Sequence, residues 1–127
     1  MRMDHEGLTT TTRRIIGCAF AVSNTLGAGF LEKVYENALA HEMRARGLTI
    51  LRQQGIAVHY KGVPMGEYTA DFLVEDKIIV ELKAVRALHE QHTAQCLNYL
   101  RAASKPVALL MNFGPPRIEV RRVTLPP

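Results

Sequence analysis

Two acids and one lysine interrupt an apolar stretch near the middle of the chain. Asp71 and Glu81 lie on either side of a polar turn at 75–77, and Lys83 follows Glu81 after one intervening residue. The flanking residues are rich in valine and isoleucine, which is typical of paired strands. A charge inside a buried strand is costly unless it is paired or binds a metal. The stretch therefore predicts a hairpin whose charged groups need either partners or a cation.

The hairpin register predicts which of these groups meet. If Val74 pairs with Ile78, Asp71 stands opposite Glu81, where the Cβ atoms of an antiparallel pair are about 4.5–5.5 Å apart. Lys83 projects from the same face as Glu81. One interpretation is structural, with an acid at a strand end and a Glu81–Lys83 salt bridge. The other is a site for Mg²⁺, which one or two carboxylates and water can hold, with the lysine stabilising the negative charge that develops on a phosphodiester.

A second group of polar residues has helical spacing. His92, Gln95 and Tyr99 fall at i, i+3 and i+7 and therefore share one face of a helix, whereas Asn98 is expected to point elsewhere. Gln95 and Tyr99 could hydrogen-bond a phosphate or an active-site carboxylate. Alternatively, Tyr99 is a core aromatic residue and His92 a surface residue. A zinc helix is not favoured, because His89 and His92 are three residues apart rather than the four of H-E-x-x-H.

Length and composition indicate one ordinary globular domain. The 127 residues, of which 47% are hydrophobic and 22% charged, can bury a core without disulfides. Cys18 and Cys96 are expected to be reduced core thiols. We expect a cytoplasmic protein without membrane contact, since no apolar run could span a bilayer and the polar N-terminus is not a signal peptide. A formal net charge of +4 favours a polyanionic partner.

The hydrophobic pattern predicts the element order ααβββαββ in a single domain of residues 1–127, in which residues 1–7 are a loose, flexible end. Helices are expected at about 9–26, 30–46 and 88–103, and strands at 48–60 (broken near 53–55), 63–74, 78–85, 107–113 and 118–125. The last strand alternates like an exposed edge strand. The basic residues near the C-terminus either form a solvated face or line a nucleic-acid path; they are Arg101, Lys105, Arg117, Arg121 and Arg122.

Five short motifs follow one another between about residues 8 and 124. They are Gly29-x-x-Glu32-x-x-Tyr35, Gly66-Glu-Tyr-Thr-Ala-Asp71, Val80-Glu81-Leu-Lys83-Ala84, Gln95-x-x-Asn98-Tyr99-Leu100 and Met111-Asn112-Phe113-Gly114. In order and spacing the chain resembles the small bacterial GxxExxY proteins, which are placed in the PD-(D/E)XK nuclease superfamily. Ala70 stands where the superfamily's name expects proline, the least consistent part of its motif. The resemblance implies an α/β (α+β) fold with a restriction-endonuclease-like core, in which helices flank a mixed central β-sheet.

The resemblance also implies a catalytic role for each acid and for the lysine. Asp71 and Glu81, helped by the backbone carbonyl of Leu82, would bind Mg²⁺ or Mn²⁺. Glu32 matches the helical glutamate that many members place near the metal, and it would complete or orient the metal shell. Lys83 would position or deprotonate the attacking water and stabilise the transition state.

Substrate contacts are expected from the helix that follows the hairpin. Gln95 and Tyr99 match the Gln-x-x-x-Tyr helix of exonuclease-like branches, and His92 on the same face is a further substrate-binding candidate. The first hypothesis is thus a metal-dependent nuclease that hydrolyses phosphodiester bonds, with DNA as the expected substrate. The alternative is a non-cleaving module on the same fold that binds nucleic acid or protein. A homodimer or a partner subunit is a third possibility.

Overall fold

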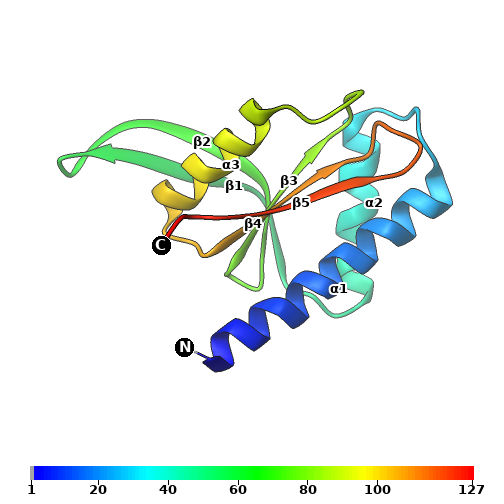
Figure 1. Ribbon diagram of the computed structural model, residues 1–127, viewed down its shortest axis with the longest axis horizontal. Helices are drawn as coiled ribbons and strands as arrows, with labels where there is room; N and C mark the ends of the chain where they lie inside the picture. The colour runs from blue at the N-terminus through cyan, green and yellow to red at the C-terminus, as the bar shows by residue number, and fades with distance from the viewer. Residues whose placement is uncertain (1) are drawn as a thin grey trace.

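The five strands form one sheet in which their spatial order is the same as their order in the chain (Figure 1). The computed structural model describes residues 2–127, with side chains from Gly7 onward. Neighbouring strands are antiparallel except for the third and fourth, which are parallel, so the sheet is mixed as expected. The strands are β1 (Ile50–Tyr60), β2 (Val63–Val74), β3 (Ile78–Lys83), β4 (Val107–Asn112) and β5 (Glu119–Thr124).

Helices cover both faces of the sheet, and each face has its own core. α1 (Arg2–Leu26) and α2 (Glu32–Ala45) pack on one face, while α3 (Glu90–Ala103) forms the crossover between the parallel strands and covers the other (Figure 1). Cys18 lies in the first core and Cys96 in the second. Both are buried and free, which confirms the prediction that they are thiols.

α1 begins earlier than the sequence predicted. It starts at Arg2 rather than near Thr9, so residues 2–7 are helical and are not the irregular end that we expected; Met1 lies outside the described residues. The apolar stripe of α1 extends upstream of Thr9, since Leu8 packs against the core one turn before the buried Thr12. The flexibility of this end stays a prediction. The other boundaries agree with the predicted ones to within two residues.

The loop between α1 and α2 is held by the first motif. The Tyr35 hydroxyl donates to the carbonyl of Gly27 at 2.6 Å and accepts from the backbone N–H of Phe30 at 3.2 Å. Its ring stacks on Phe113, with the ring centroids 4.9 Å apart. Gly29 has a φ of +106°, which favours glycine. The glycine and the tyrosine of the motif are therefore structural, and they fix the start of α2.

A buried amide fastens the end of β3 to β4. Asn112 is fully buried, and its side chain accepts from the N–H of Val85 and donates to the carbonyl of Val85, at 3.0 and 2.9 Å. Its Oδ1 also accepts from the N–H of Gly114, and its Nδ2 donates to Glu119 at 2.9 Å. A Cβ at Gly114 would overlap the carbonyl of Val85, so only glycine fits there. These contacts hold the chain immediately after Lys83.

β1 and β2 extend past the rest of the sheet as a two-stranded ribbon that reaches beyond α3 (Figure 1). Every residue of β2 from Val63 to Thr69 is exposed. The ribbon ends in the predicted turn at Lys61 and Gly62, both of which have positive φ, as a tight hairpin turn requires. Its large exposed side chains are Tyr60, Val63, Met65 and Tyr68.

Replacing Asn112 with alanine should destabilise the fold. Asn112→Ala leaves the N–H and the carbonyl of Val85 without their partner, and we expect a loss of about 2–3 kcal/mol in the free energy of unfolding. Urea denaturation measures this loss. The matched control is Asn24→Ala on the exposed side of α1, which should change the free energy by less than about 0.5 kcal/mol. Equal effects in the two variants would contradict a fastening role for Asn112.

Candidate active site

The two acids of the hairpin lie where β2 and β3 separate. The predicted pairing of Val74 with Ile78 is confirmed, and, counted outward from the turn, Phe72 is the last residue of β2 that pairs with β3. At the next position the side chains replace the ladder. Glu81 Oε1 accepts from the N–H of Asp71 at 3.1 Å, and Asp71 Oδ2 accepts from the N–H of Leu82 at 2.8 Å. The strands thus hold the two carboxyl groups side by side.

Burial makes it costly for both acids to be charged. Burial, and then the charge of Asp71, raises the pKa of Glu81 from 4.5 to about 8. Burial likewise raises the pKa of Asp71, although its hydrogen bond from Leu82 opposes the change. Two carboxyl groups in such contact titrate as a pair, and near neutral pH they retain a proton between them. A bound cation could therefore replace this proton and balance the negative charge of the two carboxylates.

Lys83 does not cancel this charge through an ion pair. Lys83 forms no salt bridge in the described part of the chain, so the Glu81–Lys83 salt bridge of the structural interpretation is not present. Lys83 is half-buried. Its positive charge partly opposes the rise in the pKa of Glu81 and of Glu32. The backbone carbonyl of Lys83 accepts from the N–H of Phe113 at 2.9 Å, which fixes the strand that carries it.

Glu32 approaches from the first turn of α2 but stays exposed. Glu32 is exposed although it lies one turn before the buried Tyr35 and Glu36, because it belongs to the first, uncovered turn of α2. Partial desolvation, and then the charge of Asp71, raises the pKa of Glu32, so it lies near the acid pair without joining it. Among the side chains that the structure describes, no three His, Cys, Asp or Glu residues gather closely enough to hold a metal ion.

Two residues near the acids were overlooked in the sequence analysis, Glu36 on α2 and Gln53 on β1. Glu36 is buried, and its carboxylate accepts from Arg52 Nη2 at 2.7 Å, from Gln53 Nε2 at 3.0 Å and from Lys33 Nζ at 3.2 Å. Burial raises the pKa of Glu36, but these hydrogen bonds outweigh it and leave the pKa below its usual value. Glu36 is therefore a charged, fully partnered anchor. Its position one helical turn after Glu32 could have revealed it.

Gln53 links this anchor to the acid pair. Its Nε2 donates to Glu36 and lies 3.5 Å from Asp71 Oδ1. Gln53 has a φ of +51°, and the pairing of β1 with β2 is interrupted at Gln53 and Asp71. This turned backbone directs the amide toward both carboxylates. The break predicted near 53–55 was the sequence signal of the feature, although β1 continues through it as one strand.

The residues predicted on α3 divide into two groups. Tyr99 is buried, and its pKa is raised to about 12 by burial and then by the charge of Glu81, so its hydroxyl stays protonated close to the acids. Gln95 is half-buried, one helical turn earlier. His92 has a local task, since its Nδ1 accepts from the N–H of His89 at 3.0 Å and caps the helix. Its substrate-binding role stays a prediction.

Comparisons with known proteins show the superfamily and the fold of the chain. The family model of the PD-(D/E)XK nuclease superfamily matches residues 9–123. The chain belongs to this superfamily. No curated protein matches the chain. Among solved structures, the crystal structure of SSO0001 matches with a TM-score of 0.61 at 18% identity, over 75% of this chain and 50% of that one, a likeness that shows the fold alone. The chain thus spans half the length of that protein.

The acid pair suits the divalent cation that PD-(D/E)XK nucleases typically use. Hard cations such as Mg²⁺ prefer oxygen ligands and need only one or two carboxylates besides water. Asp71 and Glu81 each keep one oxygen that does not accept a strand N–H. Their raised pKa values show that negative charge is unfavourable on the two acids, and a bound cation would relieve this cost.

None of the described helices is long and apolar enough to cross a membrane.

The protonation of Glu81 makes stability depend on pH. Between pH 4.5 and about 8 the folded protein keeps a proton that the unfolded chain has lost, so the free energy of unfolding falls as pH rises through this window. The contribution is at most about 1.4 kcal/mol per pH unit. Glu81→Gln cannot ionise and should lose this slope, becoming more stable relative to wild type toward pH 8.

Urea denaturation at pH 5, 6.5 and 8 in the presence of a chelator measures the difference between the two slopes. Glu67→Gln, on the exposed part of β2, is the control and should follow the wild-type curve. Parallel curves for wild type and Glu81→Gln would show that Glu81 is ionised throughout the range.

Proposed function

We propose that the chain is a divalent-metal-dependent nuclease that hydrolyses phosphodiester bonds, with DNA as the expected substrate. The observation that carries the proposal is the Asp71–Glu81 pair. A buried and a half-buried carboxyl group are each held by the other's strand, next to Lys83, which forms no ion pair with the side chains that the structure describes, in a member of a nuclease superfamily. A purely structural role does not explain this arrangement, because the two acids repel each other and Lys83 does not neutralise them through an ion pair.

In the proposed mechanism the chain supplies positioning and charge. Asp71, Glu81 and the carbonyl of Leu82 would hold Mg²⁺ or Mn²⁺, and Glu32 would complete or orient its shell. Bound there, the metal would polarise the phosphodiester and lower the pKa of a water molecule. Lys83, free of ion pairs among the described residues, would position or deprotonate the attacking water and stabilise the charge that develops on the phosphate.

The α3 residues would hold the substrate. Tyr99 keeps its proton at neutral pH and can donate a hydrogen bond to the scissile phosphate or to a carboxylate. Gln95, one turn earlier, can do the same with its amide. His92 would act at the edge of the site, through the ring nitrogen that does not accept from His89.

Three broader expectations belong to the same proposal. The glycine, glutamate and tyrosine of the first motif support placing the chain in the GxxExxY group of the superfamily. A cytoplasmic location suits its reduced thiols. The chain would act alone, as a homodimer or with a partner subunit.

A second candidate function is a non-cleaving module that binds nucleic acid or protein. It is favoured by the exposure of Glu32 and by the absence of a three-acid cluster among the described side chains. Calorimetry with Mg²⁺ and Mn²⁺ separates the two functions. No metal binding at millimolar concentration, with DNA still bound in the presence of a chelator, would favour the non-cleaving module.

The mechanism predicts that removing either charged group abolishes cleavage. Glu81→Gln and Lys83→Ala should each lower the rate on DNA by about 100-fold or more, because Glu81 would help to hold the metal and Lys83 would stabilise the charge that develops on the phosphate. Single- and double-stranded DNA and RNA should be assayed with Mg²⁺ or Mn²⁺. Glu67→Gln and Lys77→Ala are matched exposed controls and should cleave at the wild-type rate. Undiminished cleavage by both site variants would sink the mechanism.

The Glu36–Gln53 link predicts an indirect effect on metal affinity. Gln53→Gly removes the amide that lies beside Asp71 and tolerates the positive φ, so it should weaken Mn²⁺ binding about 10-fold without backbone strain. Calorimetric titration measures the affinity. Gln54→Ala changes the neighbouring amide, which has no contact with the acids, and should leave the affinity unchanged. If both variants bind Mn²⁺ like wild type, Gln53 does not position Asp71.

A further inference from the structure

A pocket of about 440 Å³ lies between the β1–β2 ribbon and the outer side of α3. The ribbon contributes Val58, His59 and Tyr68, and α3 contributes Asn98, Arg101 and Ala102. Its volume is in the range of small-molecule sites. The motif Gln95-x-x-Asn98-Tyr99 therefore has two sides. Tyr99 is turned toward the acids, whereas Asn98 is turned toward this pocket.

The pocket adjoins the acid pair through two tyrosines. The ring of Tyr68 lies against the ring of Tyr99, with the centroids 5.7 Å apart and the planes inclined by 50°. Tyr99 is buried and lies close enough to Glu81 and Asp71 for their charges to act on its hydroxyl. Tyr68, in contrast, is 50% exposed. A ligand that covers the open part of Tyr68 would thus be separated from the acids by a single side chain, Tyr99.

The lining combines the groups that bind the two parts of a nucleotide. Tyr68 offers an aromatic surface on which a base of any sequence can stack. Arg101 is exposed, and its Nη1 donates to Asn98 Oδ1 at 3.2 Å, which holds the guanidinium at the pocket wall. A guanidinium there can bind a phosphate, and the imidazole of His59 lies in the same lining.

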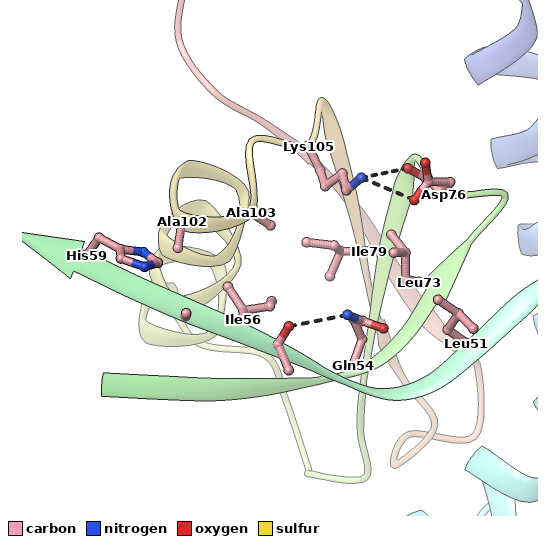
Figure 2. A pocket seen from close by; sticks show the side chains of 12 residues that line it. Leu51, Gln54, Ile56, His59, Leu73, Asp76, Ile79, Ala102, Ala103 and Lys105 are labelled. Atoms are coloured by element: carbon pink, nitrogen blue, oxygen red, sulfur yellow. Dashed lines mark hydrogen bonds and ion pairs between the residues drawn. The ribbon is translucent and has the colours of Figure 1, made fainter. Parts of the chain in front are cut away.

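A second pocket of about 370 Å³ lies beside the first (Figure 2). The two share His59 and Ala102. Figure 2 shows Lys105 and Asp76 at the far end of this second pocket, where Lys105 Nζ is 3.3 Å from the Asp76 carboxylate and 2.9 Å from its carbonyl. Because this lysine is already partnered, a phosphate at that end lacks a free cation. The Tyr68–Arg101 end remains for an anionic ligand.

We propose that the pocket between Tyr68 and Arg101 binds one unpaired nucleotide of the strand to be cut. The base stacks on Tyr68 and its phosphate lies at Arg101, so that the chain continues past Tyr99 toward the acids. Both faces of a base in a duplex are already covered by its neighbours, so the ligand is single-stranded or splayed from a duplex end. This inference rests on the proposed function, because it names the form of nucleic acid that the site accepts.

The test measures equilibrium binding of the full chain to a labelled single-stranded oligonucleotide in a chelating buffer, where no cleavage occurs. Tyr68→Ala should weaken binding about 5- to 150-fold, as expected for the loss of one stacked base, and Tyr68→Phe should restore it. Arg101→Ala should weaken binding and reduce the slope of log affinity against log salt by about 1. A blunt duplex should bind more weakly than the single strand, and none of the variants should change duplex binding by a comparable factor.

Exposed residues of the same two types outside the pocket serve as controls. Tyr60→Ala removes an exposed tyrosine at the ribbon tip outside the pocket, and Arg44→Ala removes an exposed arginine of α2. Both should bind like wild type. Unchanged binding by Tyr68→Ala, equal losses in Tyr60→Ala, or equal affinity for blunt duplex and single strand would each overturn the inference. Comparing DNA and RNA oligonucleotides of one sequence shows which of the two nucleic acids binds more tightly.

The outcomes also separate this inference from the proposed nuclease activity. Binding in a chelator does not depend on Glu81, so Glu81→Gln should bind the single strand at least as well as wild type while failing to cleave it. If cleavage is absent in wild type but Tyr68→Ala still weakens binding, the pocket stands and the nuclease proposal fails. If cleavage is present and Tyr68→Ala binds normally, the reverse holds.

Discussion

The structure depends on how it accommodates two carboxyl groups in a place where carboxylates are unfavourable. Asp71 and Glu81 accept the N–H groups that two separating strands would otherwise leave without partners, and each acid is thereby fixed by the strand of the other. The hydrogen bonds favour the charged forms, whereas burial and mutual repulsion favour the neutral ones and prevail. The point where β2 and β3 separate, which we call the fork, therefore has all its hydrogen bonds but an excess of negative charge. The surrounding elements contribute groups that act on this charge or fix the backbone around it.

Three elements meet at the fork, and each contributes a different kind of constraint. α2 approaches with one exposed acid, Glu32, and one buried acid, Glu36, whose charge is fully matched by its neighbours. α3 brings a neutral hydroxyl, that of Tyr99. β4 contributes nothing charged, yet Asn112 at its end holds the backbone beyond Lys83. Charge, hydrogen-bonding capacity and rigidity therefore arrive from separate parts of the chain.

The sequence predicted what local patterns determine and missed what depends on tertiary contact. Two apolar runs on either side of a polar turn determined the hairpin, so the register that opposes Asp71 and Glu81 followed from Val74 and Ile78. The exposure of Glu32 did not, because helical spacing places it on the same side of α2 as the buried Tyr35 and Glu36, and only tertiary packing leaves the first turn uncovered. Glu36 and Gln53 were missed because their significance comes from hydrogen bonds to each other and to Arg52 across different elements. The helical spacing from Glu32 and the predicted break near 53–55 mark the two positions, but neither pattern specifies these contacts.

The Asn112 contact also bears on the order in which the site can assemble. Asp71 and Glu81 are joined by a short loop, so the entropy lost in bringing them together is small, and they can meet as soon as the hairpin forms. Asn112 lies 27 residues from its partner Val85. Closing that longer loop requires α3 and β4 to be in place and costs more entropy. A chain that has folded only through β3 therefore has its acid pair early, while the segment after Lys83 gains its fixed geometry only when the sheet acquires its fourth strand.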